Sequence, residues 1–251
     1  KKDDQEITRY VHLGSGNYNE DTARLYTDIG LLTTNETLAN DVSEFFNVIT
    51  GHSVPSDYQN LITAPRDMRN QLIEFIEQEA DNSRNGLPSG IFIKVNSLED
   101  SEIIYALYRA SQSGVKIKLI VRGICCLRPG RQGLSENIEV ISIVGDFLEH
   151  SRIYHFHNNG NTRTYSGSAD MMVRSFDKRL ESLFKVESPL LEKQLMNILA
   201  YNLKDNFNAY VMQEDGSYLA KSPAEGESVF NVHQEFFNLD LETVQSVKLV
   251  D

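Results

Sequence analysis

The 251-residue sequence has no tryptophan, only two cysteines and no apolar run long enough to cross a membrane. Its cysteines, Cys125 and Cys126, are adjacent, and a disulfide between neighbouring residues is strained. We therefore expect buried thiols in a reducing cytosol and exclude a disulfide-stabilised secreted domain. A spanning helix needs about 20 consecutive, mostly apolar residues. The sequence predicts a soluble, cytoplasmic α/β chain, long enough for one large or two modest domains.

The sequence also has fewer basic than acidic residues. It contains 24 Lys and Arg and 36 Asp and Glu, which gives a net charge of −12. Such a chain is not a general nucleic-acid binder, and no nucleic-acid partner is expected. Residues 116–131 nevertheless hold five basic side chains and no acid, and residues 150–179 hold five against two acids. Residues 201–251 hold nine acids and three lysines. Runs of this kind are often solvated surface; here they predict a focused anion site, with phosphate as the obvious ligand.

A motif occurs twice, 153 residues apart, and we call the two occurrences the first and the second copy. Gly14-Ser15-Gly16-Asn17 is followed, eleven residues after the Asn, by Asp28. Gly167-Ser168-Ala169-Asp170 is followed at the same spacing by Glu181. The second copy also has His150-Ser151-Arg152 seventeen residues before Gly167, and the equivalent of this histidine in the first copy would precede residue 1. We therefore expect the chain to begin inside a domain.

Periodicity gives a coarse map of the fold. The predicted helices are 38–49, 67–80, 98–111 and 192–207, and the predicted strands are 6–12, 90–95, 115–121, 139–144, 152–157 and 162–167. Residues 19–32 have a mixed pattern, residues 50–57 are the best domain boundary, and residues 209–251 are an acidic tail of strands and loops. A capping box of Ser97 and Asp100 is expected to open the third helix.

Two strands and the helix between them form a predicted βαβ unit. Strands 90–95 and 115–121 should be parallel, so that Lys94 and Asn96 at one carboxyl end and Arg122 and Gly123 at the next face one crevice. The last two predicted strands flank Asn158-Asn159-Gly160-Asn161, which is a hairpin signal because Asn-Gly tolerates positive φ angles.

The repeated motif suits phosphate chemistry. A Gly-Ser turn after a strand offers backbone N–H groups and a hydroxyl, so Ser15, Asn17, Ser168 and Asp170 are candidate phosphate contacts, although such turns are often only structural. Asp28 and Glu181 could each orient an imidazole; the alternative is simple ion pairing with the nearby Arg24 and Arg179.

His150 is the strongest candidate for catalysis. Neutral imidazole can attack phosphorus or accept a proton, and protonated imidazole can neutralise a leaving phosphate. Arg152 follows on the same predicted strand and is a further phosphate candidate, although a single histidine is more often structural. His155 and His157 have no metal-ligand partners at a useful spacing and are interpreted as packing or surface residues. No metal ligand is predicted.

The pattern His-x-Lys/Arg followed by Gly-Ser-x-Asn, present twice, resembles the phospholipase D superfamily. Longer segments are similar to the long-chain polyphosphate kinases that use a phosphohistidine. These segments are residues 10–20, 22–28, 119–125, 133–138, 142–145 and 147–152, whereas Asp146, Met171 and Ser175 depart from the pattern of that family.

This resemblance implies an α/β fold with a phospholipase-D-like mixed sheet flanked by helices. It also implies the carboxyl-terminal part of a first phospholipase-D-like domain (1–52) and a complete second domain with an acidic tail (53–251). The implied reaction is reversible transfer of the ATP terminal phosphate to polyphosphate through a phosphohistidine upstream of residue 1, with Mg²⁺ screening the phosphates. His150 would be the second active-site histidine, and the ATP-binding residues would be Tyr26, Arg122, His150 and Glu181.

The partners implied are ATP or ADP and inorganic polyphosphate, with homo-oligomerisation of the full-length enzyme. The isolated chain should be inactive, and peripheral membrane association of the enzyme is left open. Two alternatives remain at this point. The first is a phospholipase-D-type phosphodiesterase, against which Arg152 and Asp170 replace the Lys and Asn of those enzymes. The second is a non-catalytic module that binds nucleotide or phosphate.

Overall fold

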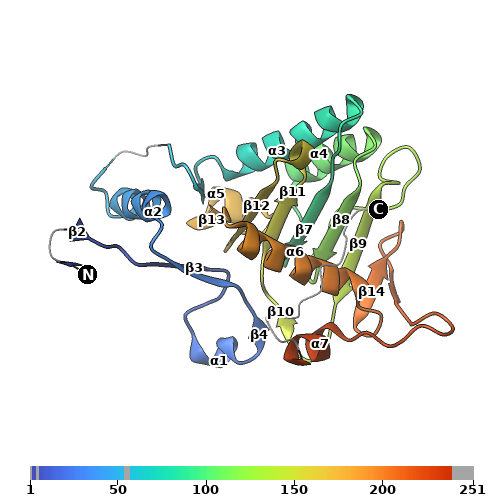
Figure 1. Ribbon diagram of the computed structural model, residues 1–251. Helices are drawn as coiled ribbons and strands as arrows, with labels where there is room; N and C mark the ends of the chain where they lie inside the picture. Colours follow the sequence, from blue (N-terminus) through green and yellow to red (C-terminus); the bar gives the residue numbers. More distant parts are fainter. Residues whose placement is uncertain (1, 4–5, 54–56, 239–251) are drawn as a thin grey trace.

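The computed structural model describes residues 2–3, 6–53 and 57–238, and its centre is a nine-stranded mixed sheet (Figure 1). In spatial order its strands are β15 (Tyr218–Ala220), β14 (Ala209–Met212), β9 (Ile138–Ile143), β8 (Ile117–Val121), β7 (Ile91–Val95), β11 (Ile153–Phe156), β12 (Arg163–Gly167), β13 (Glu181–Lys185) and β6 (Leu61–Ala64). Strands β7, β8 and β9 are parallel to one another, and the other neighbours are antiparallel. The predicted fold class, a mixed sheet flanked by helices, is confirmed.

Helices cover both faces of this sheet. In Figure 1, α3 (Met68–Arg84) and α4 (Ser101–Gln112) lie together on one face, and α6 (Pro189–Lys204) crosses the other. The stripe Met68, Leu72, Ile76 of α3 recurs every four residues and is fully buried, because that spacing returns to one side of a helix. Burying each such side chain stabilises the fold by about 1.5–3 kcal/mol.

The described residues between 6 and 49 form a region beside the sheet. Strands β3 (Val11–Gly14) and β5 (Gly30–Thr33) form an antiparallel pair, followed by α2 (Glu36–Ile49). The remaining elements are β1 (Lys2–Asp3), β2 (Glu6–Ile7), α1 (Glu20–Ala23), β4 (Tyr26–Thr27), β10 (Leu148–Glu149), the 3₁₀ turn η1 (Asn158–Gly160), α5 (Val173–Asp177) and α7 (Val232–Asn238). The short strands β4 and β10 pair in parallel and so join this region to the rest of the chain.

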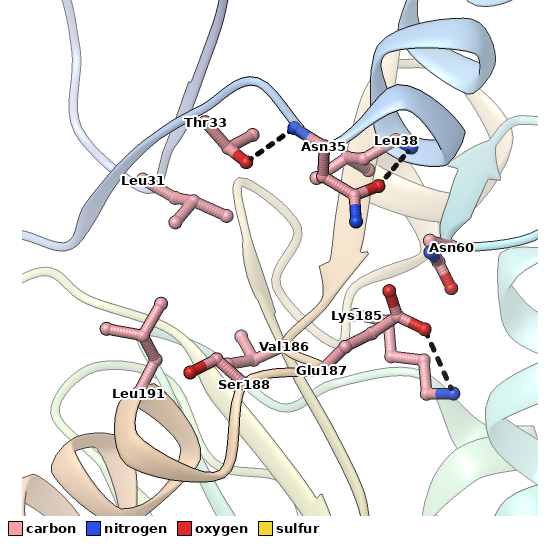
Figure 2. A pocket seen from close by; sticks show the side chains of 10 residues that line it. All are labelled: Leu31, Thr33, Asn35, Leu38, Asn60, Lys185, Val186, Glu187, Ser188 and Leu191. Atoms are coloured by element: carbon pink, nitrogen blue, oxygen red, sulfur yellow. Dashed lines mark hydrogen bonds and ion pairs between the residues drawn. The ribbon is translucent and has the colours of Figure 1, made fainter.

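Two further contacts hold the amino-terminal region in place. The buried carboxylate of Asp41 in α2 accepts hydrogen bonds from the backbone N–H groups of Gln59 and Asn60, just before β6. Leu31 of β5, Leu38 of α2 and Leu191 of α6 line a small hollow of about 110 Å³. Figure 2 shows the side chains that line it. None of the predicted site residues lines this hollow, which is part of the packing between the two regions.

Several predicted elements are confirmed. Strands β7 and β8 are parallel with α4 between them, and β11 and β12 form the predicted hairpin. Its turn has positive φ angles at Asn158, Asn159 and Gly160, as the Asn-Gly signal indicated.

The start of α4 differs from the prediction. The helix begins at Ser101, and its N-cap is Asp100, whose carboxylate accepts from the N–H groups of Glu102 and Ile103. The capping box with Ser97 is therefore wrong. Residues 97–99 instead make backbone hydrogen bonds to Ile124 and Met171, so tertiary pairing keeps them out of the helix.

Other differences arise where local pattern is weak. The segment 19–32 contains β4 and the start of β5, and the strands β6 and β13 were not predicted. The last long helix ends at Lys204 instead of residue 207, because the Asp205 side chain accepts from the N–H groups of residues 207–209. The predicted tail of strands and loops is wrong in one respect, since it contains α7; residues 239–251 lie outside the described part. Among the described helices, none is long and apolar enough to span a membrane.

Candidate active site

The two copies of the motif adopt the same turn. Ser15 N donates to the Ile29 carbonyl over 2.9 Å, and Ser168 N donates to the Ser182 carbonyl over 3.0 Å. In return, Ile29 N donates to Ser15 Oγ over 3.0 Å, and Ser182 N donates to Ser168 Oγ over 3.2 Å. The serine of each copy is thus locked to the residue that follows its acid. The sequence repeat is a structural repeat.

The acids of the two copies have different partners. Asp28 Oδ1 accepts from Ser15 Oγ over 2.7 Å and lies 2.8 Å from His150 Nδ1. The acid of the first copy therefore orients the histidine of the second. Glu181 hydrogen-bonds Ser168 in the equivalent way, and its carboxylate lies 4.0 Å from Arg179. In the described part of the chain no histidine contacts Glu181.

His150 is fixed on several sides. Its backbone N–H donates to the Thr27 carbonyl over 3.1 Å, which continues the pairing of β10 with β4. Its ring centroid lies 4.9 Å from that of Tyr26, and only 8% of the residue is exposed. Because Nδ1 is bound to Asp28, Nε2 is the nitrogen left for a ligand, and it lies 3.2 Å from Arg152 Nη1. A phosphoryl oxygen at Nε2 would also meet this guanidinium.

Arg152 ties the two copies together. Its Nη1 donates to the Ser15 carbonyl over 3.0 Å, and its Nε and Nη2 each lie 3.2 Å from an oxygen of Asp170. Asp170 Oδ1 also accepts from Asn96 N over 2.8 Å. Both carboxylate oxygens of Asp170 are therefore engaged by protein donors. This geometry favours Asp170 as the residue that holds Arg152, and weighs against the predicted direct phosphate contact.

Arg122 is anchored through one nitrogen. Its Nε donates to Asn96 Oδ1 over 2.9 Å and to the Glu149 carbonyl over 2.8 Å, and burial lowers the pKa of its guanidinium. The bonds at Nε leave the two terminal nitrogens for a ligand in the cavity that the residue lines. A guanidinium held in this way can bind an anion in a fixed direction.

These groups converge on one cavity of about 440 Å³. It is lined by Ser15, Gly16, Asn17, Asn96, Ser97, Arg122, His150, Arg152, Ser168, Asp170, Arg174, Arg179 and Glu181. The lining holds four arginines and two carboxylates, in a chain whose net charge is −12. The predicted anion site thus has a physical location where the two copies meet.

A second hollow, of about 210 Å³, adjoins this cavity across the Tyr26 and His150 rings. It is lined by Tyr26, Thr27, Phe147, His233, Phe236 and Phe237, so its walls are mainly aromatic. Its walls come from β4, the residue before β10, and α7. We call these two spaces the cationic cavity and the aromatic hollow.

The pKa values of the two acids, Asp28 and Glu181, are shifted in opposite directions. Burial raises the pKa of Asp28, but the hydrogen bonds from His150 and Ser15 outweigh it and hold the pKa below its ordinary value. Burial also raises the pKa of Glu181, and there the hydrogen bond from Ser168 does not compensate. The difference follows from the imidazole that Asp28 has and Glu181 lacks among the described residues.

The geometry brings together all the predicted site residues. Eight of them line the cationic cavity, and the ninth, Tyr26, lines the adjoining hollow. Sequence reasoning missed Arg174 and Arg179 as members of the lining, although the basic run 150–179 contained them. The aromatic wall of α7 was missed because the tail was expected to have no helix. His155, the predicted packing histidine, is buried on β11 and bonds Thr164.

Comparison with known proteins identifies the family. The family model described as polyphosphate kinase C-terminal domain 2 matches residues 61–232, and that of C-terminal domain 1 matches residues 1–55. The chain belongs to the polyphosphate kinase family. The resemblance seen in the sequence motifs is therefore confirmed.

Individual polyphosphate kinases are similar over most of the chain. The one from Synechocystis is 51% identical over 90% of this chain and 31% of its own length. The one from Rhodopirellula baltica is 45% identical over 99% of this chain and 29% of its own length. A crystal structure of polyphosphate kinase from Porphyromonas gingivalis matches with a TM-score of 0.88 and 34% identity, over 95% of this chain and 36% of that one. The chain thus spans about a third of the length of these relatives.

Proposed function

We propose that this chain forms the nucleotide side of the active site of a polyphosphate kinase, which transfers the ATP terminal phosphate reversibly to polyphosphate. The observation that carries the proposal is the cationic cavity shared by the two copies, with His150, held by Asp28, in its wall. Phosphoryl transfer depends mainly on positioning and on neutralising charge, which this lining can supply.

A nucleotide suits the two adjoining spaces. Its base would pack on Tyr26 in the aromatic hollow, and its phosphates would enter the cationic cavity past the His150 ring. Arg122 would bind the phosphates through the nitrogens that its anchored Nε leaves available. Ser15, Asn17 and Ser168 would add hydroxyl, amide and backbone donors, and Arg152 would neutralise charge at the transferred group.

His150 would act at its Nε2. With Nδ1 donating to Asp28, a neutral ring presents a lone pair at Nε2, and a protonated ring presents a second donor to a phosphoryl oxygen. In either state the imidazole assists the attacking or leaving phosphate beside Arg152.

The phosphohistidine would come from outside residues 1–251. Because Asp28 and Glu181 are equivalent in the repeat, we propose that Glu181 orients this second histidine as Asp28 orients His150. The two imidazoles would then face each other across the cavity. One would carry the phosphoryl group, and His150 would stabilise its transfer.

A dedicated metal site does not fit the residues present. In the described ranges no three His, Cys, Asp or Glu side chains come together as a metal-binding group, and the cavity carboxylates are engaged by Arg152 and Ser168. Mg²⁺ would therefore enter with the nucleotide phosphates, whose charge it screens.

The same proposal covers the organisation of the parent enzyme. Residues 1–52 would end one phospholipase-D-like domain, and residues 53–251 would form the next. The enzyme would be a cytoplasmic homo-oligomer that acts on ATP or ADP and polyphosphate.

The test is an assay of the full-length protein in both directions. With ADP and polyphosphate the protein should form ATP, and with ATP it should lengthen polyphosphate while releasing ADP. Cleavage of a phosphodiester with no transfer to ADP would identify a phospholipase-D-type hydrolase instead. Tight nucleotide binding without turnover in either direction would identify a binding module.

A further inference from the structure

Next to His150 lies a buried cluster of three ionisable side chains, none of which lines the cationic cavity. Lys94 Nζ on β7 lies 2.8 Å from Glu149 Oε2 on β10, and Glu149 Oε1 lies 2.7 Å from His233 Nε2 on α7. These side chains are between 1% and 3% exposed. Burying charge is costly even when it is paired, and an apolar group of similar size often serves stability equally well. The cluster therefore calls for a reason other than stability.

Lys94 contacts both residues that flank His150 in the sequence, Glu149 and Ser151. Besides its contact with the Glu149 side chain, its ammonium donates to Ser151 Oγ over 2.6 Å and to the Ser151 carbonyl over 3.2 Å. The residues immediately before and after His150 are thus held by one buried group. A shift of Lys94 would move the backbone on which the imidazole stands.

Glu149 connects the same cluster to Arg122. The Glu149 carbonyl accepts the Arg122 Nε hydrogen bond over 2.8 Å, while its side chain binds Lys94 and His233. Burial would raise the pKa of Glu149, but the charge of Lys94 and the hydrogen bond from His233 hold it at about 2. The carboxylate is therefore a permanent anion to which both partners are bound.

His233 extends the cluster to the aromatic hollow, which it lines together with Phe147. The ring packs edge-on against Phe147 at 5.6 Å, and its Nδ1 has no hydrogen-bond partner within the described residues. It also packs closely on Gly145, where a Cβ would lie 2.7 Å from Nδ1. Single protonation at Nε2 satisfies this arrangement, because a buried Nδ1–H would lack an acceptor.

We propose that Lys94, Glu149 and His233 are positioning residues, which together set the orientation of His150 and Arg122 and join the α7 wall of the aromatic hollow to the cationic cavity. The catalytic part of this proposal rests on the proposed function. The orientation of His150 does not, and it can be measured without turnover.

The decisive variant replaces the ion pair as a whole, with Lys94→Met and Glu149→Leu combined. An apolar pair leaves no lone buried charge, although the imidazole N–H of His233 loses its acceptor, so the melting temperature should fall by several degrees without loss of the fold. If the cluster positions His150, kcat for ATP formation should nevertheless fall roughly 10–100-fold, as small misplacements of catalytic groups do, with KM for ADP changed less than kcat. A cluster that only stabilises the fold predicts normal kcat.

A second readout is independent of activity. In the 251-residue chain, ¹H–¹⁵N NMR of the His150 imidazole should show a protected Nδ1–H bonded to Asp28, and this signal should be lost or displaced in the double variant. The matched control is Glu79→Gln, since Glu79 is a fully buried carboxylate that accepts from Gly90 N and Asn158 N instead. That change should lower stability and leave both readouts at wild-type values.

A double variant with wild-type kcat, or with an unchanged His150 signal, overturns the proposal. An inactive wild-type enzyme refutes the proposed function, and the NMR signal alone then decides the positioning claim. Should the double variant not fold, Glu149→Gln keeps the shape of the side chain but removes its charge. The same loss of the His150 signal is expected there, and retention of the signal contradicts the proposal.

Discussion

The first and the second copy of the motif share one turn geometry but present their acids in two electrostatic states. Both serines bond the residue after their acid, with N–H···O distances of 2.9–3.2 Å. Asp28 is hydrogen-bonded to the His150 imidazole as well as to its serine, and its pKa is lowered. Glu181 is hydrogen-bonded to its serine but to no imidazole among the described residues, and its pKa is raised. Because the turns match, the difference lies in the partner, and that partner comes from the other copy.

This crossed pairing explains why the parts of the candidate site are not close together in the sequence. His150 belongs to the second copy, but Asp28, Thr27 and Tyr26 of the first copy orient it. Arg152 spans the same boundary, from Asp170 to the Ser15 carbonyl. Neither copy has a complete site alone.

The largest expected effect comes from His150→Ala in the full-length enzyme. Loss of a positioned proton donor or acceptor should lower kcat by about 10²–10⁴. The matched control is His155→Ala. His155 is also a buried histidine, three residues after Arg152 in the sequence, but it lines neither the cationic cavity nor the aromatic hollow. This control should lose about 1–3 kcal/mol of stability and keep its kcat per folded molecule.

Calorimetry and steady-state kinetics on both variants decide between the roles. A His150→Ala protein with near-normal kcat and a strongly lowered melting temperature would make His150 the structural histidine.

A smaller effect is expected from Arg122→Ala. A charge-assisted hydrogen bond to phosphate contributes roughly 1.5–3 kcal/mol, so kcat/KM for nucleotide should fall about 10- to 100-fold. Arg122→Lys should recover only part of this loss, since lysine cannot make both Nε contacts while presenting terminal donors. Arg109, which pairs with Glu77 at the surface, supplies the control, and Arg109→Ala should leave kcat/KM unchanged. Equal kinetics for all three variants would remove Arg122 from the site.

The smallest expected effect is on the free energy of unfolding, where replacing Asp28 and replacing Glu181 should give different results. Asp28 has a lowered pKa, so its charged form stabilises the fold above its ordinary pKa of 3.8, and this contribution is lost as pH falls through the lowered value. Glu181 has a raised pKa, so its charged form opposes folding above its ordinary pKa of 4.5. At neutral pH, Asp28→Asn should therefore cost about 1 kcal/mol, whereas Glu181→Gln should cost nothing or stabilise.

Urea unfolding of the 251-residue chain measures both differences. The penalty of Asp28→Asn should shrink as the pH is lowered below 3.8, because Asp28 then loses its charge in the wild type as well. Equal penalties for the two variants at neutral pH would mean that the copies are electrostatically alike.

Much of the site could be predicted from the sequence because its residues follow regular strands. Local sequence patterns predicted the βαβ unit, the hairpin and the repeat. These predictions in turn located Arg122, His150 and Ser168. The match of the two spacings indicated paired sites. It did not indicate that Asp28 would cross to His150, since the pairing depends on β4 lying beside β10.

The remaining elements depend on tertiary contacts. Strands β4 and β10 have two residues each and carry no periodicity that a sequence pattern could reveal. Helix α7 begins where the side chains of Asp205 and Asn231 accept the N–H groups of Val232 and His233, and Asp205 lies far from it in sequence. The aromatic hollow and the buried Lys94–Glu149–His233 cluster were missed for this reason.

We expect Glu181 to bind a histidine from outside residues 1–251, and this histidine to carry the phosphoryl group. The most direct test is to incubate the full-length protein and the 251-residue chain with γ-labelled ATP, and to map any acid-labile, base-stable phosphate. We expect labelled phosphate in the full-length protein on a histidine outside this chain, and no labelled phosphate on the isolated chain. Label on His150, or on any other histidine of residues 1–251, would contradict this expectation.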